Sequence, residues 1–124
     1  MKQTIKYRKH KDRRTGRFDC GKLYLKEIEA ESYEEAVQKF QKEYGIGQYD
    51  IQHPDTEKTE YFVGNLVDYD VQSMQERMEK YQIHFRIGDL AYDRNGKQLS
   101  DRYHPIFIHS DDMQKYDQMM RNNP

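Results

Sequence analysis

Alternating apolar and polar positions at the start of the chain predict a β-hairpin. Residues 3–13 and 17–30 have the strand pattern, and Arg14-Thr15-Gly16 between them suits a three-residue loop with glycine in the left-handed conformation. If the numbers of paired residues sum to 30, Ile5 faces Leu25 and Tyr7 faces Leu23. One face of the hairpin is then apolar.

The opposite face of this hairpin is then basic. The same register places Lys6, Arg8 and His10 against Tyr24, Lys22 and Cys20. After Leu25 the apolar positions change from odd to even numbers, so we expect a bulge or strand break near Lys26-Glu27.

A capping box, Ser32-Tyr33-Glu34-Glu35, predicts the start of a helix. Apolar residues follow at helical spacing until Gly45 ends the pattern: Tyr33, Ala36, Val37, Phe40 and Tyr44. We expect this helix to pack on the hairpin.

The rest of the chain alternates short strand patterns with two helical stripes. Strands are predicted over 49–52, 61–67, 83–87 and 105–109, and Asn95-Gly96 predicts a tight hairpin turn. One helical stripe follows an expected cap at Asp70 and the other begins at Ser110. Their apolar positions are Val71, Met74, Met78 and Tyr81, and then Met113, Tyr116 and Met120.

These elements predict an α+β fold. The approximate order is ββα-ββα-ββα, which gives one antiparallel sheet built from β-hairpins with about three helices packed on it. A chain of 124 residues has the size of one domain, so we expect a single domain over residues 1–124.

Composition narrows the class of protein. Hydrophobic and charged residues each make up 35% of the chain, which predicts a small core and a heavily solvated surface. The single cysteine excludes an internal disulfide and fits a reducing compartment. Because no apolar run is long enough for a membrane span or a secretory signal, we expect a cytoplasmic protein with no membrane partner.

The charge distribution is strongly asymmetric. Seven of the twelve residues from Lys6 to Arg17 are basic. Residues 1–26 have ten basic and two acidic side chains, whereas residues 27–124 have eleven basic and twenty acidic ones. The two segments therefore have net charges of +8 and −9, which sum to the formal total of −1. Clustered positive charge predicts a polyanionic partner for the N-terminal end.

The leading hypothesis is a small non-enzymatic protein that binds nucleic acid, or the nucleic-acid channel of a nucleoprotein enzyme, through the basic hairpin. A basic β-ribbon can lie in a groove and neutralise phosphates. The alternative is that these charges pair internally, for instance Lys11 with Asp19, and both interpretations stay open. The expected interface residues are Lys6, Arg8, Lys9, Lys11, Arg13, Arg14, Arg17, Lys22 and Tyr24.

Residues 6–45 also show a resemblance to a known family. The basic hairpin with Thr15-Gly16 at its turn, followed by Ala30-Glu31-Ser32-Tyr33-Glu34-Glu35-Ala36, resembles the small arm-binding domains of phage-type integrases. The hairpin supplies one strand fewer before the helix than those domains have. The resemblance implies a basic sheet that lies in a DNA groove and is backed by one helix.

A second hypothesis is a protein inhibitor that presents a decoy for a basic groove. A compact, highly charged, tyrosine-rich chain without catalytic motifs is similar in composition to small phage or mobile-element proteins that block host nucleases, including anti-CRISPR proteins. The expected decoy residues are Glu27, Glu29, Glu31, Glu34 and Glu35.

Catalytic candidates are few. His10 and Cys20 are opposite each other in the derived register, but no orienting carboxylate is predicted beside them. A third hypothesis, a metal-dependent hydrolase around His104 and His109, meets the difficulty that residues five apart on a strand point to opposite faces. No phosphate loop or zinc motif is present. We therefore expect no enzyme activity, no cofactor and no metal.

Overall fold

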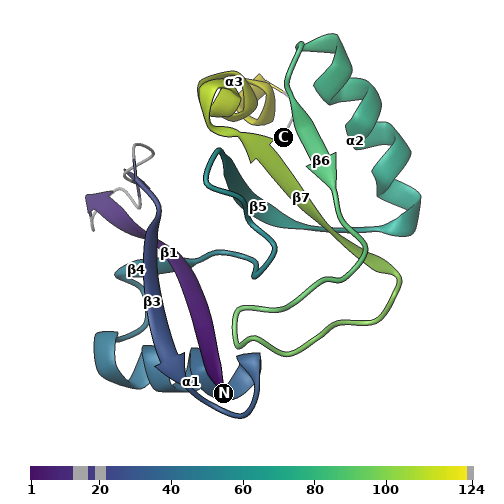
Figure 1. Ribbon diagram of the computed structural model, residues 1–124. Coiled ribbons are helices and arrows are strands. Elements are labelled where there is room, and N and C mark those ends of the chain that lie inside the picture. Colours follow the sequence, from purple (N-terminus) through teal and green to yellow (C-terminus); the bar gives the residue numbers. More distant parts are fainter. Residues whose placement is uncertain (13–16, 19–21, 123–124) are drawn as a thin grey trace. The chain divides into compact units, whose positions relative to one another are not determined.

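The computed structural model describes residues 1–12, 17–18 and 22–122, with the backbone alone at 10–12 and 17–18. The chain forms two compact units (Figure 1). The first unit is Met1–Asp55 with Tyr92–Gln98, and the second is Thr56–Ala91 with Leu99–Pro124. The α+β class is confirmed. One sheet was expected, whereas each unit has its own antiparallel sheet. The single-domain boundary stays a prediction.

The first unit is organised around one long strand. Strand β1 (Lys2–Asp12) pairs antiparallel with β2 (Arg17–Phe18), β3 (Tyr24–Glu29) and β4 (Tyr49–Ile51). The second arm of the predicted hairpin is thus divided into β2 and β3. The predicted loop Arg14-Thr15-Gly16 and Cys20 lie outside the described residues.

The predicted register of β1 and β3 is wrong by one residue. Ile5 pairs with Lys26 and Tyr7 with Tyr24, so paired numbers sum to 31 and not 30. A shift of one residue exchanges the two faces of a strand, and Leu25 is accordingly 54% exposed. Pairing continues unbroken through Lys26 and Glu27, so the expected bulge is absent from this stretch. Tyr24 and Ile28 supply the inward face that Leu23 and Leu25 were expected to supply.

Helix α1 (Tyr33–Tyr44) begins and ends where the sequence predicts. The Ser32 hydroxyl accepts a hydrogen bond from the Glu35 amide at 3.2 Å. At the other end, Gly45 has a φ of 85° and donates its N–H to the Gln41 carbonyl at 2.8 Å. Helix α1 lies against β1 and β3 (Figure 1), and its apolar residues pack on these strands. The buried core of this unit consists of Ile5, Ala30, Ala36, Val37 and Phe40.

A turn at Asn95-Gly96 completes the first unit. The Asp93 carboxylate accepts hydrogen bonds from the Asn95 and Lys97 amides at 2.8 and 3.0 Å. Gly96 has a φ of 78°, and a Cβ at this position would lie 2.8 Å from Cγ2 of Val37. The predicted turn is therefore confirmed, although only Tyr92 and Gln98 pair across it.

The second unit has a three-stranded sheet in the order β5-β7-β6. Its elements are β5 (Glu60–Val67), α2 (Asp68–Lys80), β6 (Phe85–Ile87), β7 (Tyr103–His109), η1 (Ser110–Asp112) and α3 (Met113–Asn122). Both helices contribute methionines to one apolar cluster with strands β5 and β7. The buried members are Tyr61, Met74, Met78, Ile83, Ile106, Ile108, Met113 and Met119.

The helix starts in this unit differ from the prediction. Helix α2 begins at Asp68, so Asp70 is in its first turn and is not the cap. Ser110 is part of η1, whose cap is the His109 side chain. Carboxylates in a first turn stabilise the helix through its dipole without capping it. Within the described residues, no helix has the length and apolarity needed to cross a membrane.

Candidate nucleic-acid interface

Lys9 and Lys22 converge on one tyrosine ring in the first unit. The two Nζ atoms lie 4.5 and 4.8 Å from the centroid of the Tyr24 ring. Both lysines are exposed, and neither forms an ion pair with any residue that the structure describes. An ammonium group over a tyrosine face is attracted by the ring while it keeps its charge. Among the described residues, no carboxylate therefore pairs with these two positive charges.

Tyr24 is itself held by a cluster of aromatic rings. It stacks on its cross-strand partner Tyr7 with ring centroids 5.4 Å apart. Tyr7 in turn contacts Phe40 of α1 and Tyr49 of β4, at 4.9 and 5.4 Å. Burial raises the pKa of Tyr7, so its hydroxyl stays neutral. The rigid packing of α1 against the sheet thus fixes the ring to which the lysines bind.

A third lysine lies beside the same aromatic cluster. Lys26 approaches the ring of Tyr44, with its Nζ 5.7 Å from the centroid. A hydrogen bond to Tyr44 raises the pKa of Lys26, which therefore keeps its positive charge at neutral pH. Tyr44 also contacts Phe40 and Tyr49. From the sequence, Lys26 was expected at a bulge. The observed register, which pairs Lys26 with Ile5, would have placed it on the inner face.

Arg8 and Tyr24 differ from the predicted interface. Arg8 was expected on an exposed basic face, but it is only 2% exposed and its Nη2 lies 2.6 Å from Oδ2 of Asp50. The cause is strand β4, which pairs Asp50 directly with Arg8. Tyr24 was expected among the cations of that face, and it is on the same face as Tyr7 because of the register shift. Arg8 is therefore a structural residue and not part of the surface.

The remaining predicted interface residues are only partly described. Lys6 is half-buried and pairs with Leu25 across β1 and β3. The side chains of Lys11 and Arg17, and the whole of Arg13 and Arg14, lie outside the described residues. The same holds for the proposed pair of His10 and Cys20. Of the predicted set, the structure thus brings Lys9, Lys22 and Tyr24 together.

The predicted acidic decoy residues are spread over β3, the following loop and α1. Glu29 binds the N-terminal amino group at 2.8 Å, and Glu35 binds Lys39 at 3.1 Å. Glu27 lies 3.9 Å from Lys2. Hydrogen bonds from the Lys39 side chain and from the Glu31 amide lower the pKa of Glu35. Three of the five carboxylates thus have an internal cation, which reduces the charge that they present to a partner.

A second group of charged residues lies at one end of the sheet in the second unit. Glu60 on β5 pairs directly with His109 on β7. The β6 register continues this row to His84, whose carbonyl accepts the His109 N–H at 3.0 Å. Directly opposite residues of antiparallel strands share a face. The imidazole rings of His84 and His109 have centroids 6.2 Å apart.

Asp112 fixes the orientation of His84. Its Oδ2 accepts hydrogen bonds from both the amide and the Nδ1 of His84, each at 2.7 Å. Lys115 lies 3.6 Å from the other oxygen, Oδ1. The His84 amide is the main cause that lowers the pKa of Asp112, followed by the imidazole and Lys115. The buried carboxylate is therefore ionised at neutral pH.

Glu60 forms a two-pronged ion pair beside this row. Its two oxygens accept hydrogen bonds from Nε and Nη2 of Arg86 at 2.9 and 2.7 Å. The guanidinium also lies 3.9 Å from the centroid of the Phe107 ring. Arg86 thus lowers the pKa of Glu60. The two hydrogen bonds fix the orientation of Arg86 and Glu60 at this end of the sheet.

The arrangement does not favour the metal-dependent hydrolase. His104 binds Asp68, whereas His109 is near His84 and Asp111. The two predicted ligands thus belong to different clusters on β7. In the described part of the chain, no group of three histidine, cysteine or carboxylate side chains is placed to hold a metal ion.

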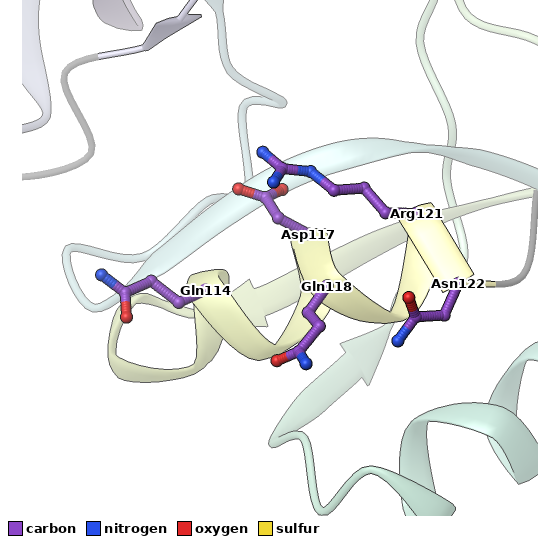
Figure 2. A pocket seen from close by; sticks show the side chains of 5 residues that line it. All are labelled: Gln114, Asp117, Gln118, Arg121 and Asn122. Atoms are coloured by element: carbon purple, nitrogen blue, oxygen red, sulfur yellow. The ribbon is translucent and has the colours of Figure 1, made fainter.

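Two surface hollows add no chemical site. A hollow of about 480 Å³ lies beside α3, and Figure 2 shows polar and charged side chains around it. A smaller one of about 260 Å³ lies within the first unit, near the end of α1 and Arg94. The first lacks the apolar lining of small-molecule sites. Asp50 lines the second hollow, but its carboxylate already binds Arg8. The lining of the first is Gln114, Asp117, Gln118, Arg121 and Asn122.

Comparison with known proteins gave no match. No family model, no curated protein and no solved structure matches this chain. Function has to be inferred from the geometry and charge of the described residues.

Proposed function

We propose that the first unit binds nucleic acid through the surface formed by Lys9, Lys22 and Tyr24, with Lys26 beside it. The observation that carries this proposal is the pair of exposed ammonium groups on one tyrosine ring. In the described residues they have no carboxylate partner. A phosphate oxygen can therefore bind them without breaking an ion pair to any described residue.

The expected recognition is electrostatic. Ammonium groups are point charges that bind phosphate oxygens without reading base edges. The ring of Tyr24 has Tyr7 stacked on it and two lysines over it, so its role is to hold the cations and not to stack on a base. We therefore propose sequence-independent binding to the phosphate backbone. The other basic residues of the N-terminal run would extend the contact.

Salt dependence tests the proposal directly. Affinity for a fluorescent oligonucleotide is measured by anisotropy at several salt concentrations. If about four or five phosphates are contacted, the log-log slope is about −4. The double variant Lys9→Gln/Lys22→Gln should bind more weakly and make the slope about 1.8 less steep, because two contacts are lost.

The matched control removes two other lysines of the same unit. Lys2→Gln/Lys39→Gln makes the same change in net charge, but these lysines lie near Glu27 and Glu35. It should leave the slope within about half a contact of the parent value. No complex with the parent protein at low salt, or the same loss in both double variants, would exclude this surface as the binding site.

A further inference from the structure

We propose that His84 and His109 form an acid–base pair that cleaves RNA phosphodiester bonds without a metal ion. This activity goes beyond the proposed binding function and depends on residues of the other unit. From the sequence, His109 was considered only as a metal ligand together with His104. They lie on neighbouring strands, and their ring centroids are 6.2 Å apart. Two imidazoles this close can both reach one phosphoryl group, whose attacking and leaving oxygens lie in line on opposite sides of phosphorus.

The hydrogen bonds assign His84 the role of base. An ionised carboxylate can only accept a hydrogen bond, so the His84 Nδ1 that lies 2.7 Å from Asp112 carries the proton. The neutral ring then has its lone pair on Nε2. The His84 side chain is 83% exposed, so a substrate hydroxyl can reach this nitrogen. A buried carboxylate that orients an imidazole in this way is the usual support for a general base.

The hydrogen bonds give His109 the opposite tautomer from His84. Its Nδ1 accepts the Asp111 amide at 3.2 Å, so the proton of the neutral ring is on Nε2. The Asp111 carboxylate, whose Oδ2 lies 3.7 Å from Nδ1, is the counter-ion of the ring when the ring carries a second proton. The imidazolium then presents an acidic N–H at Nε2. The two histidines thus differ in the role that their surroundings favour.

Charged neighbours face the pair from several elements. Glu60 on β5 pairs with His109 across the sheet, and its carboxylate binds Arg86 on β6. Asp111 and Asp112 in η1 contact the two Nδ1 atoms. The half-exposed Lys115 ammonium on α3 lies 3.6 Å from Asp112.

RNA is the substrate class that this chemistry requires. The described residues place no serine or cysteine nucleophile within hydrogen-bonding distance of His84. The ribose 2′-hydroxyl supplies the nucleophile that the protein lacks. His84 Nε2 takes the 2′-hydroxyl proton as the bond from O2′ to phosphorus forms. The bond from phosphorus to O5′ breaks, and O5′ takes a proton from His109 Nε2. The products are a 2′,3′-cyclic phosphate and a 5′-hydroxyl.

The test uses the full chain, EDTA and the ribodinucleotide uridylyl-(3′→5′)-adenosine. Chromatography should detect uridine 2′,3′-cyclic phosphate, and the analogue with a 2′-deoxyribose at uridine should stay intact. The rate should show a bell-shaped pH dependence, because His84 must be neutral and His109 protonated. So small a substrate does not need the Lys9 and Lys22 surface, so the test does not depend on nucleic-acid binding there.

Three variants, purified identically, separate the pair from a contaminating nuclease. His84→Gln and His109→Asn should each lower the rate by at least about 100-fold, the usual effect of losing a general acid or base. Asparagine at 109 retains an acceptor for the Asp111 amide, and circular dichroism checks the fold. His104→Gln, the control on the same strand, should keep the parent rate. Absence of cleavage, equal rates in all variants, or cleavage of the deoxy analogue would overturn the proposal.

Discussion

One surface in each unit shows a different way of holding cations. In the first unit, Lys9 and Lys22 rest on a tyrosine ring and have no carboxylate partner among the described residues. In the second unit, Arg86 and Lys115 each lie against a carboxylate. A cation on an aromatic face retains its charge, whereas an ion pair fixes geometry and neutralises charge. The first arrangement suits a polyanion, and the second suits precise orientation of side chains.

Arg8 shows the same difference within a single strand. Arg8 neighbours Lys9 on β1 but is buried. It pairs with the Asp50 carboxylate, just as the cations of the second unit pair with carboxylates. Two adjacent basic residues of one strand therefore have different roles. A run of basic residues in a sequence is not by itself a binding surface.

Asp50→Asn should give a large change in stability. The substitution keeps the shape of the side chain but removes the carboxylate that lies 2.6 Å from the buried guanidinium of Arg8. Loss of one partner of a buried ion pair costs about 3 kcal/mol or more. Urea unfolding at neutral pH measures the free energy of unfolding.

The control for this variant is an exposed pair in the same sheet. Glu27→Gln removes a carboxylate 3.9 Å from Lys2, where both side chains are mostly exposed. It should change the free energy of unfolding by less than about 0.5 kcal/mol. Equal effects from the two variants would mean that Arg8 is as solvated as Lys9, and the contrast within β1 would be lost.

Local signals in the sequence predicted most helices and strands but not the sheets. Ser32 and Gly45 mark both ends of α1, since capping depends on neighbouring residues. The register of β1 and β3 depends on Phe40 and Tyr44 of α1, whose contacts favour Tyr24 and Lys26 on the inner face over Leu25. Such tertiary contacts are not visible in an alternation pattern.

The candidate site was predictable to a similar extent. Net charge pointed to Lys9 and Lys22, but the burial of Arg8 depends on Asp50, which is 42 positions away on β4. The pairing of His84 with His109 was not predictable either. Residues 88–102 separate the two strands, and the hairpin turn predicted within them at Asn95-Gly96 does not set the register that pairs position 84 with position 109.

Asp112→Asn should change the acid stability of the second unit. Hydrogen bonds from His84 lower the pKa of Asp112 below its ordinary value of 3.8. A depressed pKa in the folded state contributes stability above the ordinary value, and this stability is lost as the pH falls through the folded pKa. The variant should be less stable at pH 7, and its stability should fall less steeply between about pH 4 and pH 2.

Urea unfolding at a series of pH values measures this difference. Asp111→Asn is the matched control, because the Asp111 carboxylate next to Asp112 in the sequence is 87% exposed to solvent. The control should follow the parent curve within about 0.5 kcal/mol. Parallel curves for the parent and Asp112→Asn would show that the carboxylate does not hold His84 in solution, and would also remove the support for His84 as a base.

Leu25→Ala should have the smallest effect, and it tests the register on which the lysine surface depends. With paired numbers summing to 31, Leu25 is mostly exposed, so the variant should lose less than about 0.5 kcal/mol of unfolding free energy. Ile5→Ala on the buried face should instead lose about 2–5 kcal/mol, because it leaves a cavity. A sum of 30 would bury Leu25 opposite Ile5 and make both losses large. In that register Tyr24 would leave the Tyr7 stack, and Lys9 and Lys22 would no longer share its ring.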